Sequence, residues 1–584
     1  MSGALPRVLR GRPAPVAVAV ATALALVLLG PALAPGLVQS FDLVTAPDAR
    51  FTPFALGAGV VAPRAVPSDA VVAALSVLLP TSLVQKVLLV AVLVGAGAGC
   101  ARLAGVLVAG RVGPGAAATA QVVAAVAGTW NPFVAERLVL GQWTVLVGWA
   151  VLPWATASVL SEASAGDGRP RAAVVRACAW VALATLGGAN TVVVVLPAVL
   201  LAAVALRRVA LAVAVLLTAV AGSACWWLPA LVRIDQASGQ AGTQAFVARA
   251  DNPLGLLATL LAGAGSWNRA VVPPGREVAL VAAAAAALAV VVVVAALPVL
   301  RRREGAAVLV PGLVGLGWCL LPAAPATRDA VSALLAAVPG GGLLRDGQKV
   351  LAWWVLLTSC AAGVTAARLV AHGTRTAALV VLLALAPPAL LPAAAWGVAG
   401  RVAAVEVPPE YGALAAEVDR APAGVVASLP WGQYRAYAWN GGRVSLDLQP
   451  RLLDRRVLVD DSLRVRDDLV VPGEDPVAAS VSRALADGEP VDAALRAAGV
   501  RLVVVDLPAG DDALRELDAG GAERLWQGRR TVLLDLGEPG RAGPPDRVDA
   551  VQRAGWAVSL LAWGAVAGGL VVAATRRRNG ATGG

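Results

Sequence analysis

"PVAVAVATALALVLLGPALAPGLVQSFDLVTAPDARFTPF", residues 15–54, leads from an uninterrupted apolar run into a polar loop. The run from Pro15 to about Leu33 is long enough to cross a hydrocarbon core of about 30 Å as a helix. It is longer than the apolar core of a typical signal peptide, and similar runs follow it, so we expect it to be retained as a membrane span. The chain has 584 residues, of which 58% are hydrophobic, and a soluble protein of that length could not bury so much apolar surface. The sequence therefore predicts a polytopic helical membrane protein.

The remaining apolar runs predict an all-α bundle of about twelve transmembrane helices. We expect the spans at residues 15–34, 83–100, 115–129, 143–160, 173–188, 190–206, 209–229, 278–300, 305–322, 350–371, 377–398 and 554–574. The apolar stretch 70–79 is too short to cross a membrane and is predicted to be re-entrant or interfacial.

Charge predicts the orientation of this bundle. If the N-terminus is cytoplasmic, the cytoplasmic segments carry 18 arginines and only three acidic residues, a net charge of +15. Because positive residues accumulate in the cytoplasmic loops of membrane proteins, both termini are expected in the cytoplasm. Residues 400–553 carry 19 arginines and 25 acidic residues and are expected outside the cell membrane. The overall net charge of +11 is then a consequence of topology, and we do not interpret it as nucleic-acid binding.

The long polar insertion at 400–553 predicts a small extracytoplasmic α/β domain. Its strand-like stretches are 424–431, 455–461, 500–507 and 530–536, and its amphipathic helical stretches are 475–488 and 491–499. The expected organisation is a transmembrane bundle of about eleven spans at 1–399, the α/β domain at 400–553, and a final transmembrane helix with a basic tail at 554–584.

Cysteine and histidine are too scarce for several kinds of site. All five cysteines lie in or at the ends of predicted spans, without metal-type spacing, and the only histidine, His372, falls in a short cytoplasmic turn. The sequence therefore argues against a zinc site and a Ser/His/Asp triad, and it predicts no disulfide framework for 400–553.

The loop after the first span carries the first candidate site residues. Asp42 and Asp48 are expected at the outer membrane interface, and three of the five phenylalanines of the chain lie nearby and can anchor the loop. A carboxylate in that place can serve as a general base or hold a divalent cation against a phosphate. The alternative is that Asp42 is simply the first polar residue after the span and that Asp48 caps a turn.

Two further stretches place charges at predicted membrane boundaries. "GTWNPFVAERLVLGQW" (128–143) puts Glu136 and Arg137 on a short interfacial helix between two tryptophans, and the alternative is an aromatic belt with a snorkelling ion pair. "GGGLLRDGQKVLAWW" (340–354) brings Arg345 and Lys349 to the membrane, where the two cations would suit a lipid phosphate. The alternative there is an ordinary charged span boundary.

Aromatic residues gather in "LPWGQYRAYAWNGGR" (429–443), which holds Tyr434 and Tyr437, two of the three tyrosines. Exterior aromatics can stack on sugar rings, or they can form the core of the domain or its seat on the membrane. We favour the structural role.

These features together resemble the GT-C class of polyprenyl-phosphate-dependent membrane glycosyltransferases. "FDLVTAPDARF" (41–51) is similar to the acidic first loop of actinobacterial arabinofuranosyltransferase-like membrane proteins, although here five residues separate the two acids. "NPFVAERLVLGQW" (131–143) and "GLLRDGQK" (342–349) look like stretches of their actinobacterial relatives. The resemblance implies a protein of cell wall biogenesis that transfers a sugar from a polyprenyl-phosphate donor to an envelope glycan or lipid on the outer face.

The resemblance also implies direct displacement at the anomeric carbon. A carboxylate would deprotonate the acceptor hydroxyl, and a cation or basic side chains would stabilise the departing lipid phosphate. We assign the catalytic set to Asp42, which is nearest the membrane surface, and Asp48. The candidate substrate contacts are Asp69, Glu136, Arg137, Arg345 and Lys349. The cofactor is left open, with Mg²⁺ or Mn²⁺ held by Asp48 or Asp69 as the candidate.

The expected partners are membrane lipids, the polyprenyl-phosphate-linked sugar and an envelope glycan acceptor, without nucleic acid. The rival class is non-enzymatic: a transporter or flippase for a lipid-linked glycan, or an assembly partner that kept the fold. The predicted spans hold no deep carboxylate, which argues against ion coupling but leaves passive lipid handling open. A purely structural envelope protein is the third alternative.

Overall fold

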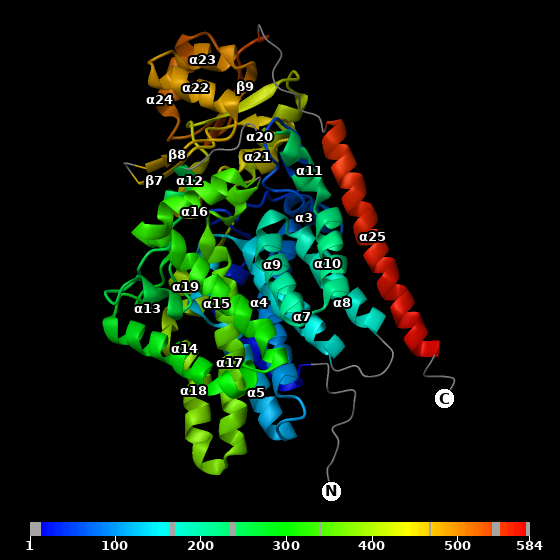
Figure 1. The fold of residues 1–584 in the computed structure, drawn as a ribbon. Coiled ribbons are helices and arrows are strands. Elements are labelled where there is room, and N and C mark those ends of the chain that lie inside the picture. The colour runs from blue at the N-terminus through cyan, green and yellow to red at the C-terminus, as the bar shows by residue number, and fades with distance from the viewer. Residues whose placement is uncertain are drawn as a thin grey trace.

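The computed structural model describes residues 13–163, 170–233, 241–338, 340–466, 469–539 and 549–579. Over these residues the chain forms a large helical bundle with a smaller α/β unit at one end, and the last helix runs along one side (Figure 1).

Most of the expected spans are confirmed as long apolar helices. Seven helices are long and apolar enough to cross a membrane: α1 (Pro15–Leu29, continued by the 3-10 turn Gly30–Leu33), α4 (Thr81–Val108), α7 (Trp143–Ala163), α14 (Ala279–Leu300), α15 (Arg303–Leu320), α17 (Leu351–Ala371) and α25 (Ala550–Asn579). Two bent pairs follow: α10 (Val209–Gly222) with α11 (Ala224–Val232), at 68°, and α18 (Ala377–Leu390) with Pro392–Gly400, at 61°. The described residues therefore hold seven candidate spans, or nine if each bent pair crosses once.

The expected count of twelve spans is not confirmed. The other three predicted spans correspond to α5 (Pro114–Thr129), α8 (Pro170–Leu186) and α9 (Ala189–Ala205), which have 16, 17 and 17 residues. At about 1.5 Å of rise per residue these helices are shorter than the roughly 30 Å hydrocarbon core. Composition cannot distinguish such short helices, packed within a bundle, from full spans.

The apolar stretch 70–79 forms no span, as expected. Helix α3 (Ser68–Ser76) has only nine residues. Val77 and Leu78 follow it as an exposed apolar tip, which suits an interfacial position.

The α/β unit is built on a five-stranded sheet in the order β10-β11-β9-β3-β6. Its strands are β3 (Val425–Leu429), β6 (Val457–Leu458), β9 (Val500–Asp506), β10 (Glu523–Gln527) and β11 (Thr531–Asp535). Strands β6, β3 and β9 are parallel, and β11 and β10 are antiparallel to their neighbours. All four predicted strands and both predicted helices, α22 (Pro476–Ala486) and α23 (Val491–Ala497), are present.

The two faces of this sheet are covered by different parts of the chain. Because side chains alternate along a strand, Val503 and Val505 of β9 lie in one core and Leu502 and Val504 in another. The first core is closed by α22, α23 and α24 (Asp511–Ala519). The second is closed by α20 (Glu410–Arg420), by α21 (Gln449–Leu452) and by residues of the loop after α1. That loop is therefore part of the core of the α/β unit.

Backbone pairing also holds the loop after α1 to the α/β unit. Strand β1 (Leu37–Val38) pairs antiparallel with β2 (Ala404–Val405). Further on, Phe41 N donates to Val444 O at 2.8 Å, and Leu446 N donates to Phe41 O at 2.8 Å. The loop is thus fixed between the bundle and strand β5 (Val444–Leu446).

Candidate functional site

Asp42 lies where three segments of the chain meet. Phe41 adopts a left-handed backbone conformation, φ 42°, and Asp42 N donates to Leu140 O at 3.0 Å. The neighbouring Gly141 has φ 68°, and a Cβ there would collide with the backbone of Ser40 and Leu43. Glycine at 141 therefore lets the turn after α6 (Pro132–Val139) pack directly against the loop that carries Asp42.

Two side chains donate hydrogen bonds to the half-buried Asp42 carboxylate. Tyr434, on strand β4 (Tyr434–Ala436) of the α/β unit, donates to Oδ1 at 3.2 Å. Gln142, in the turn after α6, donates to Oδ2 at 3.3 Å. Burial raises the pKa of Asp42 above its ordinary value, and the two hydrogen bonds and the nearby charges of Lys349 and Arg451 oppose that rise only in part.

Two predicted cations lie in the same region as this group. Lys349 lies at the end of the 3-10 turn Gly347–Lys349, near enough to Asp42 and Asp346 to interact with their charges. Among the described residues it has no acid within ion-pair distance. Arg345 stacks over the ring of Phe246, with the guanidinium carbon 4.9 Å from the ring centroid. The structure thus brings the predicted Arg345 and Lys349 to the same region as Asp42.

Arg64 adds a further cation to this region, from the segment before α3. It pairs with Asp461 at 3.3 Å and with Glu474 at 3.1 Å, both in the α/β unit. Its charge interacts with Tyr434 and with Arg345. Arg64 therefore ties the loop to the α/β unit on the side where Tyr434 meets Asp42.

Arg137 and Glu136 lie beneath the site and not in its surface. Arg137 is 1% exposed and pairs with Asp346 at 3.3 Å. It also donates to the side-chain oxygen of Gln142, so that it reaches Asp42 only through that amide. Glu136 is likewise buried and accepts from Gly265 N at 3.4 Å. Burial, followed by the charge of Asp251, raises the pKa of Glu136 to about 7.

Asp48 and Asp69 are not brought together with Asp42. Asp48 is exposed and pairs with Arg50 at 3.0 Å. Asp69 is mostly buried and pairs with Arg451 at 2.9 Å, and burial raises the pKa of Asp69. The first acid is in solvent, and the second is neutralised by an arginine.

The residues around Asp42 do not fit a divalent cation. Within the described ranges no three His, Cys, Asp or Glu residues gather as a metal-ligand set. The groups that face Asp42 are an amide, a phenol and two cations, and cationic side chains repel a metal ion. We therefore derive no step through Mg²⁺ or Mn²⁺.

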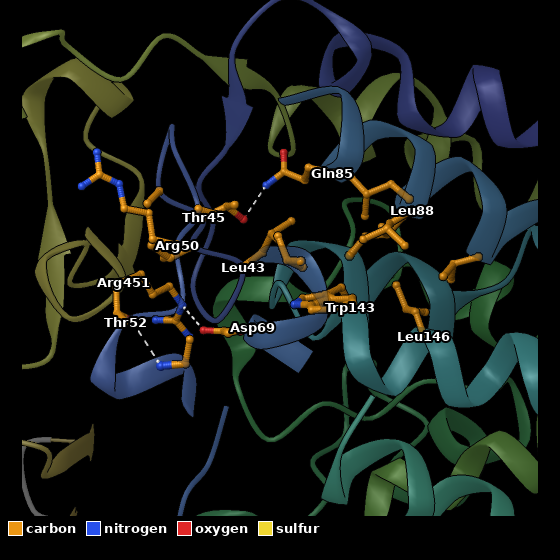
Figure 2. Close-up of a pocket in the computed structure, with 18 of the residues that line it drawn as sticks. Leu43, Thr45, Arg50, Thr52, Asp69, Gln85, Leu88, Trp143, Leu146 and Arg451 are labelled. Carbon is orange, nitrogen blue, oxygen red and sulfur yellow. Dashed lines mark hydrogen bonds and ion pairs between the residues drawn. The ribbon is translucent and has the colours of Figure 1, made fainter. Parts of the chain in front are cut away.

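A groove beside the site runs from the loop after α1 to the membrane helices. It is narrow, with a cavity volume of about 40 Å³. Leu43 and Thr45 line it on the loop side, Leu88 and Leu146 belong to α4 and α7, and the Arg451–Asp69 pair lies at its polar end (Figure 2). Its lining is mostly apolar, with the ion pair at one end.

Sequence reasoning did not connect Gln142 or Tyr434 with Asp42. Both residues lie in stretches that the sequence analysis singles out for other residues: the charges in 128–143 and the aromatics in 429–443. A signal was present for Gln142, since a lone amide beside a glycine in an apolar segment often has a specific hydrogen-bonding task. No local signal assigns Tyr434 to Asp42, which is 392 residues away in the chain.

Solved structures define the class of this fold. The chain is similar to the mycobacterial arabinofuranosyltransferase AftD, with 17% identity and a TM-score of 0.56 over 92% of this chain and 42% of that chain. It thus spans less than half the length of AftD. The chain therefore shares the fold of the matched part of AftD, in agreement with the resemblance found in the sequence.

More distant likenesses involve an archaeal oligosaccharyltransferase from Archaeoglobus fulgidus. Its structure with zinc and sulfate has 14% identity and a TM-score of 0.38 over 84% of this chain and 68% of that chain. A structure of AglB from the same organism, with an inhibitory peptide and a dolichol-phosphate, has 12% identity and a TM-score of 0.35 over 84% and 69%. No protein-family model matches the chain, and no curated protein sequence matches it.

Proposed function

We propose that this protein is a membrane glycosyltransferase that transfers a sugar from a polyprenyl-phosphate donor to an envelope glycan or lipid on the outer face. The observation that carries the proposal is the half-buried Asp42 carboxylate, held by Gln142 and Tyr434 and flanked by Lys349. Support for the class comes from the AftD-like fold.

The proposed reaction is a single displacement. The acceptor hydroxyl oxygen forms a bond to the anomeric carbon as the bond from that carbon to the lipid phosphate oxygen breaks. The hydroxyl proton moves to Asp42, and the phosphate leaves with the bonding electron pair. Lys349 and Arg345 stabilise the charge that develops on that phosphate.

Asp42 fits the role of the base better than Asp48 does. Its raised pKa makes it a stronger base than an exposed carboxylate, and its two donors fix its direction. Asp48 is exposed and paired with Arg50, so the proposal gives it no proton-transfer step. Asp69 is proposed to contact substrate only through the Arg451 pair at the end of the groove.

The donor to test first is a polyprenyl-phosphate-linked arabinofuranose, because the AftD structure is that of an arabinofuranosyltransferase. The purified full chain in lipid nanodiscs is incubated with this radiolabelled donor and an arabinofuranosyl oligosaccharide. Asp42→Asn keeps the size of the side chain and removes its basic charge, so transfer is expected to fall by about 10²–10⁴-fold. Asp48→Asn is the matched control and is expected to change transfer by less than tenfold.

A second arm uses a strain that lacks the gene. The wild-type copy is expected to restore the lost envelope glycan, and Asp42→Asn is expected to fail while reaching the membrane at normal abundance. Full restoration by Asp42→Asn would contradict the enzyme and favour a transporter, flippase or assembly partner.

A further inference from the structure

We propose that Gln142 is a positioning residue, which orients the Asp42 carboxylate and couples it to the buried Arg137–Asp346 ion pair. The inference rests on the proposed function only in so far as Asp42 is the base. The contact itself exists whatever the reaction.

Chemistry fixes which end of the Gln142 amide faces Asp42. The guanidinium of Arg137 has only donors, and its Nη1 donates to Gln142 Oε1. The amide oxygen must therefore face Arg137. Because the two ends of the amide lie on opposite sides, its nitrogen must face Asp42, where Nε2 donates to Oδ2 at 3.3 Å. Gln142 presents a donor, and not an acceptor, to the base.

Arg137, which holds the Gln142 amide, is itself held firmly in place. Its side chain is almost fully buried, it pairs with Asp346 at 3.3 Å, and its guanidinium carbon lies 5.5 Å from the centroid of the Phe133 ring. A weaker contact goes to Gln348 Oε1 at 3.5 Å. Residue 142 is also tied to it through the backbone, since Gln142 N donates to Arg137 O at 2.9 Å. The Gln142 amide therefore has little freedom to turn away from Asp42.

Four groups face the Asp42 carboxylate, each from a different element. Gln142 comes from the turn after α6 and Tyr434 from β4, and each donates to one oxygen. Lys349 from the turn before α17 and Arg451 from α21 act through their charges. Among the described residues, Gln142 is thus one of only two hydrogen-bond donors to the Asp42 carboxylate.

The variant Gln142→Glu separates positioning from a structural role. A glutamate keeps the length of the side chain and an acceptor for Arg137, so a purely structural role is preserved. It has no donor for Asp42 and sets a negative charge beside it, which disfavours ionisation of Asp42. Gln348→Glu is the matched control, because it sets the same charge on the same arginine without a contact to Asp42.

The readout is the protonation midpoint of Asp42 by infrared difference spectroscopy of the full chain in nanodiscs. The carbonyl stretch of protonated Asp42 is assigned by its absence in Asp42→Asn. In Gln142→Glu we expect the midpoint to rise by about one pH unit or more, as a like charge nearby requires. In Gln348→Glu we expect less than half of that shift.

The result that would overturn the proposal is a Gln142→Glu midpoint equal to the wild-type one, or a Gln348→Glu shift just as large. If Gln142→Glu does not fold, Gln142→Leu removes the donor without adding a charge and is expected to raise the midpoint by a smaller amount. An unchanged midpoint in that variant also contradicts the proposal.

The protonation midpoint of Asp42 is measured without substrate. A failure of the positioning role of Gln142 can therefore be distinguished from a failure of the proposed function. In an active protein, the acid limb of the kcat/KM profile is expected to follow the midpoint in Gln142→Glu. An acid limb that stays in place while the midpoint moves would show that Asp42 is not the base.

Discussion

Glu136 and Asp42 are both carboxyl groups withdrawn from water, but their surroundings differ. Glu136 accepts one long backbone hydrogen bond, from Gly265, and Arg137 and Arg276 offset the burial and the charge of Asp251 only in part. Asp42 has two side-chain donors and two cations near it. At the scale of single residues, burial raises both pKa values, and the rise is opposed by side-chain hydrogen bonds at Asp42 and by a backbone hydrogen bond at Glu136.

The buried Glu136 predicts a pH-dependent stability. Its folded pKa of about 7 lies above its ordinary value of 4.5, so the folded state binds a proton more tightly than the unfolded state does. This contribution is present in acid and is lost as the pH rises from about 4.5 to about 7. Glu136→Gln mimics the neutral acid, and its Tm is expected to exceed the wild-type Tm by about 2 °C or more at pH 8 but by much less at pH 5.

Glu417→Gln, on α20 at the surface, is the matched control for this measurement. Its Tm relative to the wild type is expected to be the same at both pH values. If Glu136→Gln has a lower Tm at pH 8 than the wild type, the ionised Glu136 carboxylate stabilises the folded protein, which would contradict this prediction.

Some residues of the candidate site could be proposed from the sequence, and others could not. Asp42 was found because it stands where an apolar run ends, which is visible without a structure. Arg345 and Lys349 were found for the same reason at another boundary. Tyr434 and Gln142 could not be joined to Asp42, because the contacts bridge 392 and 100 residues of chain. Asp48 has the same local appearance as Asp42, and only the fold separates the exposed acid from the half-buried one.

At the scale of elements, the loop after α1 does more than connect a span to the next helix. Its Val44 and Ala46 belong to the core under the sheet, and β1 pairs with β2. The strands of the α/β unit were predictable from their short apolar runs. The contribution of this loop to their core was not predictable from the sequence, because two residues in a loop carry no periodic pattern. The three short helices α5, α8 and α9 show the opposite limit, since their composition alone suggested full spans.

The turn after α6 predicts a specific effect of one added methyl group. Gly141→Ala would strain a backbone with φ 68° and press the new Cβ into Ser40 and Leu43. The loop that carries Asp42 must then shift. We expect sugar transfer to fall at least about tenfold, because small displacements of a catalytic group have large effects on rate.

Gly115→Ala is the control for that experiment. Gly115 lies in the first turn of α5 with open space around it, so alanine is expected to be neutral or slightly stabilising there. Transfer by Gly141→Ala at the wild-type rate would mean that the loop and the turn do not need close contact for activity.

At the scale of the whole molecule, the site exists only because the bundle and the α/β unit meet. Asp42 follows α1, Gln142 precedes α7, and Tyr434 belongs to β4 of the α/β unit. The α17–α18 turn and the C-terminal end of α25 lie at the other end of the bundle (Figure 1). This separation agrees with the division of charge in the sequence, since the predicted cytoplasmic segments have a net charge of +15 and residues 400–553 have more acids than arginines.

The proposed orientation can be tested in living cells with alkaline phosphatase, which is active only outside the cytoplasm. Arginine-rich connections are retained in the cytoplasm, so a fusion after Arg303, the first residue of α15, is expected to be inactive. A fusion after Gly442, in the open turn between β4 and β5, is expected to be active. The same two fusions to a reporter that is active only in the cytoplasm serve as the control and should give the inverse result.

Because Asp42 and Tyr434 are hydrogen-bonded, they must lie on the same side of the membrane, so the Gly442 fusion reports on the candidate site itself. An inactive Gly442 fusion beside an active Arg303 fusion would place Asp42 in the cytoplasm, where the proposed transfer to an envelope acceptor on the outer face could not occur.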